Sequence, residues 1–249
     1  MRRKQACAKS FAMAFPSRAS HAANMFTRNF GIALLSLVST GLFAAEDAGW
    51  KLLFNGKDTD GWAQKGGVAK YRVEDGVLIG TSQPNTPNSF LCTTREYTNF
   101  ILEVEFNVAD GLNSGVQIRS HSYPTNTEVL WKGKPVKVPA NRVHGYQVEI
   151  VTTARAWTGG IYEEGRRGWL NNLTNNPPAR AAFKHNAWNK FRIEAVGDSI
   201  KTTLNGVPAA DLRDALTPAG FIGLQVHGVG KRTNDLEVRF KNVRIKELP

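Results

Sequence analysis

Cysteine is scarce in this sequence of 249 residues, which contains only Cys7 and Cys92. Cys7 belongs to an N-terminal leader that we expect to be removed, so the remaining chain cannot form an intramolecular disulfide. We expect Cys92, in a strand-like segment, to be a small buried hydrophobic residue.

Familiar catalytic motifs are also missing: there is no Gly-rich phosphate loop, C-x-x-C pair, H-E-x-x-H helix or G-x-S-x-G elbow. The sequence therefore gives no sign of the chemistry that those motifs support.

Acidic residues are absent from residues 1–45, which carry six basic residues. Residues 30–43 form a short apolar run that ends at the small pair Ala44–Ala45. This pattern predicts a secretory signal peptide, and the run is shorter than the roughly 20 residues of a membrane-spanning helix. We therefore expect an exported protein, periplasmic or extracellular, without a stable membrane span. Met25 begins a better-proportioned signal and is an alternative start.

Much of the surplus positive charge comes from this leader. The full chain has 32 basic and 21 acidic residues and a formal charge of +11. Removing the six leader cations leaves about +5. The remaining basic residues are scattered along the chain and form no stripe, so the sequence gives no support for a nucleic-acid partner.

Beyond the leader, short runs of alternating apolar and polar residues are separated by turn pairs such as Asn55-Gly56. Many short strands at this spacing predict an all-β sandwich or barrel and argue against a βαβ fold. Only short segments, such as 209–216, are compatible with a helix. No repeat or low-complexity linker divides residues 49–248, so we predict that they form one domain.

Three predicted strands present the same polar pattern on one face. Side chains alternate across a sheet, so the apolar residues of segments 115–119, 145–150 and 222–227 are predicted to face the core. The opposite face then carries Gln117 and Arg119, Gln147 and Glu149, and Gln225 and His227. If the strands are neighbours, the cation, the carboxylate and the imidazole converge on one site. The alternative is the ordinary solvated face of an antiparallel sheet, which needs no function.

Two stretches, 120–141 and 152–183, do not alternate and are rich in Asn, Pro, Gly and Arg. Loops of this length in a compact domain are usually functional or disordered. Four residues of the second stretch combine aromatic surfaces with hydrogen-bond donors: Trp157, Tyr162, Arg166 and Trp169. A sugar needs this mixture, because its hydroxyls require polar partners and its C–H face packs on an aromatic ring. We therefore predict that these residues bind carbohydrate; the alternative is a Gly-rich loop with solvated charges.

The histidines offer no recognisable metal site. Four follow the leader: His121, His144, His185 and His227. None of them has the spacing of metal ligands. We predict no cofactor, and the sequence leaves the presence of a divalent metal open.

Short motifs occur in a fixed order along residues 49–248. They are LFNG and GW (53–62), NSGVQIR (113–119), GYQVEI (145–150), TGGIY (158–162), WN (188–189), NG (205–206), GLQVHG (223–228) and FKNVRI (240–245). With these motifs the chain resembles the 3-keto-disaccharide hydrolase family. The resemblance implies a concanavalin A-like jelly roll of two antiparallel sheets, typically in an exported bacterial protein. It also implies cleavage of glycosides that carry a ketone at C3.

The C3 ketone accounts for that cleavage, because it acidifies the proton on C2. A base can remove this proton, and the enolate can expel the C1 substituent by elimination. Addition of water to the unsaturated product gives net hydrolysis. On the shared polar face, the base would be Glu149 or His227, and His227 would protonate the leaving oxygen. Arg119, aided by Tyr162, would stabilise the enolate. Three glutamines would orient the sugar hydroxyls: Gln117, Gln147 and Gln225.

Two other functions fit the same fold. A non-catalytic carbohydrate-binding module would bind glycans and release no product. A retaining glucanase needs two carboxylates about 5 Å apart, often arranged on one strand as E-x-D-x-x-E. No such run occurs in this sequence.

Overall fold

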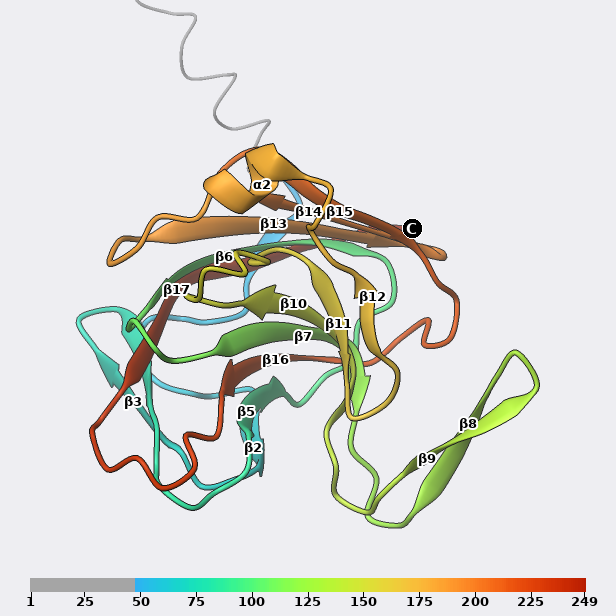
Figure 1. The fold of residues 1–249 in the computed structure, drawn as a ribbon, viewed down its shortest axis with the longest axis horizontal. Coiled ribbons are helices and arrows are strands. Elements are labelled where there is room, and N and C mark those ends of the chain that lie inside the picture. Colours follow the sequence, from blue (N-terminus) through green and yellow to red (C-terminus); the bar gives the residue numbers. More distant parts are fainter. Residues whose placement is uncertain (1–47) are drawn as a thin grey trace, which may run out of the picture. The chain divides into compact units, whose positions relative to one another are not determined.

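The computed structural model describes residues 48–249, which form two stacked antiparallel β-sheets, a separate hairpin and a short helix (Figure 1). This architecture confirms the prediction of an all-β jelly-roll sandwich. The predicted leader, residues 1–45, lies outside the described residues. Within residues 48–249, no helix is long and apolar enough to span a bilayer.

The first sheet has eight strands. In spatial order they are β15 (Val207–Arg213), β14 (Ser199–Leu204), β13 (Asn189–Val196), β6 (Phe100–Val108), β17 (Glu237–Glu247), β4 (Val77–Thr81) and β3 (Lys70–Glu74), with β1 (Trp50–Leu52) paired to β17.

The second sheet has seven strands. In spatial order they are β12 (Gly168–Asn171), β11 (Ile161–Glu164), β10 (His144–Ile150), β7 (Ser114–His121), β16 (Phe221–Val226), β5 (Ser89–Thr93) and β2 (Trp62–Gly66). The three strands predicted to share a polar face, β7, β10 and β16, are therefore neighbours.

The hydrophobic core lies between the two sheets. Val104 and Phe106 of β6 are completely buried and belong to the same apolar cluster as Val148 and Ile150 of β10 and Leu224 of β16. The apolar sets predicted from alternation thus form the inner face of the second sheet. We call the opposite side, which faces away from this core, the outer face.

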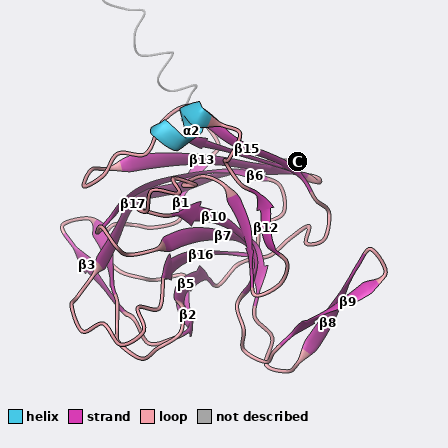
Figure 2. Ribbon diagram, in the orientation of Figure 1, coloured by secondary structure: helices cyan, strands magenta, loops and turns pink. Residues whose placement is uncertain are grey.

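The two stretches predicted to be long loops contain regular structure. The first holds the hairpin β8 (Thr127–Trp131) and β9 (Lys134–Val138), which lies apart from both sheets (Figure 2). The second holds β11, β12 and the helix α2 (Pro177–Ala181). Segment 209–216, which the sequence allowed as a helix, lies largely in β15, because its backbone pairs with β14.

A small second apolar cluster lies on the outer face of the second sheet, and it consists of Phe90, Cys92, Val143 and Phe221. Phe90 and Cys92 alternate along β5 with Leu91, which belongs to the core. Cys92 is completely buried, as expected, and burial raises the pKa of its thiol to about 12. At neutral pH this thiol is therefore protonated and unreactive.

Candidate active site

The outer face of the second sheet carries a polar pocket of about 360 Å³ above β10 and β11. Its lining residues are Asn88, Asn113, Arg142, Gln147, Glu149, Arg155, Tyr162, Glu164, Trp169 and His227. Five of them were predicted from the sequence as site residues: Gln147, Glu149, Tyr162, Trp169 and His227. The pocket therefore brings together one predicted carboxylate, one imidazole and two aromatic rings.

Glu149 is a buried carboxylate near the end of β10, and only 4% of it is exposed. Asn113 Nδ2 donates to Oε1 at 2.7 Å, and Gln147 Nε2 donates to Oε2 at 2.9 Å. The Arg155 guanidinium lies 3.5 Å from Oε1. Burial raises the pKa of Glu149, and these donors and His227 offset only part of that rise. A carboxylate with a raised pKa is a better proton acceptor near neutral pH.

A chain of hydrogen bonds runs from Glu149 along the outer face to β7. Gln147, which donates to Glu149, accepts from Gln117 Nε2 at 2.6 Å, and Gln117 accepts from Ser120 Oγ at 2.8 Å. Gly115 makes room for this chain, because a Cβ at that position would lie 2.6 Å from the Gln147 side chain. The chain fixes the Gln147 amide and, through it, the orientation of the carboxylate.

His227 follows the end of β16 and lies at the rim of the pocket. Its Nδ1 is 2.7 Å from the Gly228 carbonyl oxygen, so in the neutral ring Nδ1 carries the proton and donates it. Nε2 is then the acceptor of the neutral ring. Asn88 fixes this turn by accepting from the Gly228 N–H at 2.9 Å.

Aromatic rings and one arginine form a wall of the pocket. Trp169 makes edge contacts with both Tyr162 and Trp157, at centroid distances of 5.4 and 4.7 Å. The Arg155 guanidinium lies about 5 Å from both indole rings. Trp157 was predicted to bind substrate, but it is not among the lining residues and reaches the wall only through its contact with Trp169. Burial, followed by Glu164 and Glu149, raises the pKa of the Tyr162 hydroxyl.

Arg119 does not converge with Glu149 and His227, so that prediction is wrong. Its guanidinium is buried and donates to the carbonyl oxygens of Thr98 (2.8 Å) and Gly197 (2.7 Å). The reason is a register shift between β7 and β10, at which Arg119 adopts a φ of +45°. The shift interrupts the alternation, so Arg119 joins the two sheets and contributes to their packing.

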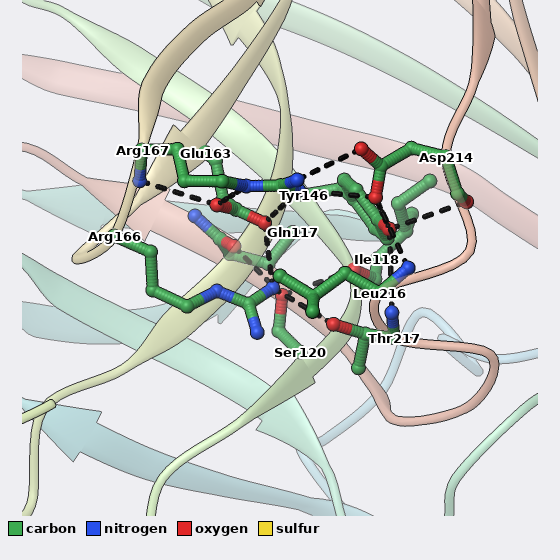
Figure 3. A network of polar contacts seen from close by, with 10 residues as sticks. All are labelled: Gln117, Ile118, Ser120, Tyr146, Glu163, Arg166, Arg167, Asp214, Leu216 and Thr217. Carbon is green, nitrogen blue, oxygen red and sulfur yellow. Dashed lines mark hydrogen bonds and ion pairs between the residues drawn. The ribbon is translucent and has the colours of Figure 1, made fainter. Parts of the chain in front are cut away.

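Arg166 is also absent from the pocket, contrary to prediction, because it belongs to a buried ionic network between β11 and the loop before β16 (Figure 3). It donates to Glu163 at 2.7 Å and to Thr217 at 2.8 Å, and its side chain is 1% exposed. Arg167 donates to the same carboxylate and to Asp214 at 2.8 Å. The sequence left open a Gly-rich loop with solvated charges, whereas ion pairing buries these charges.

Two of the predicted glutamines are buried and do not line the pocket. Gln117 is completely buried within the hydrogen-bonded chain. Gln225 is also completely buried, and no residue in the described part of the chain hydrogen-bonds to its Oε1 or Nε2. A buried amide without partners costs about 1–3 kcal/mol, and such groups in native structures call for a specific explanation.

Five pocket residues were missed by the sequence analysis: Asn88, Asn113, Arg142, Arg155 and Glu164. Glu164 could have been found, because alternation in β11 places it on the same face as Tyr162. Asn113 directly precedes β7 and begins the motif NSGVQIR (113–119). The other three lie in connecting segments, where no periodicity indicates which way a side chain points.

A comparison with protein families decides the affiliation of this chain. The model described as the 3-keto-alpha-glucoside-1,2-lyase-like domain matches residues 49–246. The chain belongs to this family. The resemblance stated from the sequence motifs is therefore confirmed, and the family supports a carbohydrate-active protein. A search of curated proteins found no match.

Solved structures support the fold of this family member. A protein proposed to be a glycosyl hydrolase, from Parabacteroides distasonis, aligns with a TM-score of 0.53 at 21% identity, over 85% of this chain and 99% of the other. A Bacillus subtilis protein of unknown function with a galectin-like fold aligns with a TM-score of 0.54 at 11% identity, over 80% of this chain and 94% of the other. At these identities the likeness establishes the sandwich fold.

Within residues 48–249 of this family member, no group of three or more His, Cys, Asp or Glu side chains is arranged to hold a metal ion. In the pocket, Glu149 accepts from two amides and Glu164 accepts from Arg142. Both pocket carboxylates therefore act as hydrogen-bond acceptors of protein groups.

Proposed function

We propose that this protein cleaves 3-keto-glucosides by base-catalysed elimination, with Glu149 as the base. The observation that carries the proposal is a buried carboxylate of raised pKa, held by two amides and facing a polar pocket. Membership of the family supplies the sugar class. The substrate chemistry then requires one base beside C2, a donor beside the C3 oxygen and a proton for the leaving oxygen.

The proposed reaction has two steps. Glu149 takes the C2 proton, and the electron pair of the C–H bond forms the enolate with the C3 oxygen. The enolate then restores the C3 carbonyl, the C1–O bond breaks and C1=C2 becomes a double bond. The leaving oxygen takes a proton, for which the proposed donors are the Tyr162 hydroxyl and the protonated ring of His227, which would give the proton from Nε2. Addition of water to the product would give net hydrolysis.

Arg155 takes the role that the sequence analysis gave to Arg119. The C3 oxygen is bonded to the neighbour of C2, so the group that stabilises the enolate must lie beside the base. The Arg155 guanidinium lies 3.5 Å from the Glu149 carboxylate, and the Arg155 side chain, which lines the pocket, is 42% exposed. A positioned cation at the developing oxyanion is typically a large contribution to catalysis. Trp169 would pack on the C–H face of the sugar.

A retaining glucanase is less well supported, although the pocket contains a second carboxylate, Glu164. Its backbone partner on β10 is Gly145, four residues from Glu149. Four strand residues span about 13 Å, whereas a retaining pair requires carboxyl groups about 5 Å apart. Glu164 is also engaged by Arg142.

The test of this proposal compares a 3-keto-glucoside with the same glycoside before oxidation. Only the keto compound has an acidified C2 proton, so we expect release of the aglycone from it alone, measured by chromatography. Replacement of the C2 hydrogen by deuterium should slow the reaction, because the C2–H bond breaks in the proposed first step. Binding of both glycosides without any product would contradict the proposal and indicate a carbohydrate-binding module; cleavage of the unoxidised glycoside alone would indicate an ordinary glycosidase.

The pH profile should show the raised pKa of Glu149. The base must be ionised, and burial moves its pKa above the ordinary value of 4.5. We therefore expect kcat/KM to fall on the acid side through an apparent pKa above 4.5, measured over about pH 4–8 in buffers of constant ionic strength. An acid limb centred at or below 4.5 would contradict the assignment of Glu149.

A further inference from the structure

A second pocket, of about 330 Å³, adjoins the polar pocket on the outer face. Two residues, Asn88 and Arg142, line both pockets. The other residues of the second pocket are Gly66, Pro87, Phe90, Pro139, Ala140, Asn141 and Val143. The two pockets therefore adjoin each other at Asn88 and Arg142.

The second pocket differs from the first in chemistry, because most of its lining is apolar. Phe90 and Val143 come from the small apolar cluster on the outer face, and Pro139 and Ala140 are exposed residues of the segment between β9 and β10. Gly66 keeps the wall open, since a Cβ there would lie 2.4 Å from the Asn88 carbonyl oxygen. No charged side chain other than Arg142 is among these residues.

We propose that this apolar pocket is the subsite for the leaving group, and that the preferred substrates are 3-keto-glucosides of phenols. The proposal rests on the proposed function. When the sugar occupies the polar pocket with C2 at Glu149, the group on C1 needs space outside that pocket, and the apolar pocket adjoins it at Asn88 and Arg142. A second sugar would find few polar partners there, whereas an aromatic ring would pack against Phe90, Pro87 and Pro139.

The position of Arg142 supports a phenolic leaving group. Arg142 lines both pockets, and its guanidinium donates to the buried Glu164. A glycosidic oxygen that crosses from one pocket to the other would therefore pass beside this residue. Phenols ionise at about pH 10, so a phenol can depart as an anion that a neighbouring guanidinium stabilises. Size is also compatible, because an apolar cavity of about 150 Å³ is enough for benzene.

The test uses leaving groups of equal acidity and increasing apolar size: the phenyl, 4-ethylphenyl and 4-propylphenyl 3-keto-glucosides. The alkyl group hardly changes the acidity of the phenol, so a difference in kcat/KM reports binding in the subsite. A buried methylene contributes about a fourfold increase. We therefore expect kcat/KM to rise along the series by at least about tenfold.

The variant Ala140→Trp fills the pocket, and the backbone N–H of residue 140, which donates to Asn126 Oδ1 at 2.8 Å, is retained. It should abolish the rise along the series. Ala181→Trp is the matched control, because Ala181 is an exposed residue of α2, which contacts β15 of the first sheet; it should keep the rise.

Each outcome is decisive. Cleavage of the phenyl compound with no rise along the series, or with the same rise in Ala140→Trp, overturns the subsite and leaves the proposed function standing. A tenfold preference for a 3-keto-disaccharide over the phenyl compound also overturns the subsite alone. Failure to cleave any 3-keto-glycoside overturns the proposed function and the subsite with it.

Discussion

Replacing Glu149 by glutamine is expected to lower kcat on a 3-keto-glucoside by about 10²–10⁴-fold, with a much smaller effect on KM. Glutamine has nearly the same shape and can still contact Asn113 and Gln147, the two amides that hold the carboxylate. It cannot take up a proton at C2. Steady-state kinetics would measure the loss of turnover. Circular dichroism of the same preparation would show whether the variant is folded.

Glu105→Gln is the matched control for this experiment. Glu105 makes the same kind of contacts, accepting from Asn242 at 2.9 Å and lying 3.6 Å from the Lys241 ammonium, but it is on β6 of the first sheet. Its substitution should leave kcat within about twofold, since surface changes of this kind are usually small. If both variants keep wild-type kcat, Glu149 is not the base and His227 becomes the candidate.

Replacing Glu163 by glutamine is expected to lower the free energy of unfolding by about 3–5 kcal/mol. Glu163 is completely buried and accepts hydrogen bonds from both Arg166 and Arg167 (Figure 3). Loss of its charge leaves the guanidinium of Arg166, which is 1% exposed, without this carboxylate partner. Burial of an uncompensated cation is costly. Urea unfolding followed by circular dichroism measures the change.

An exposed ion pair provides the comparison. Arg213 and Asp198 are 2.6 Å apart, and their side chains are 71% and 48% exposed. Water screens such a pair, so Asp198→Asn should cost less than about 1 kcal/mol. Equal losses in Glu163→Gln and Asp198→Asn would show that the buried network contributes no more than a surface pair.

Alternation predicted much of the site because the polar side chains follow regular strands. Glu149 and Gln147 lie on the outer face of β10 as the period of two requires, and the turn pairs predicted the many short strands. Alternation failed at Arg119, where the register shift of β7 places two consecutive side chains, Ile118 and Arg119, in the interior. A backbone irregularity of this kind has no signature in residue type alone.

The remaining differences come from loops and from pairing between distant residues. Arg142 and Arg155 lie outside regular strands, so only the folded chain brings them to Glu149 and Glu164. Arg166 looked accessible in sequence because its partner Thr217 lies 51 residues away. Sequence patterns describe which face a strand residue occupies; they do not describe which distant group neutralises a charge.

The chain from Ser120 to Glu149 has a direction, and the charge state of Glu149 sets it. An ionised carboxylate only accepts hydrogen bonds, so the amide nitrogen of Gln147 must point toward it and the oxygen toward Gln117. The same rule then turns the Gln117 oxygen toward the Ser120 hydroxyl. When Glu149 takes up a proton, the carboxyl group can also donate, and the fixed direction of these hydrogen bonds is no longer required. Gln117 is completely buried. The NMR resonances of its side-chain amide would therefore report the titration of Glu149 in the absence of substrate.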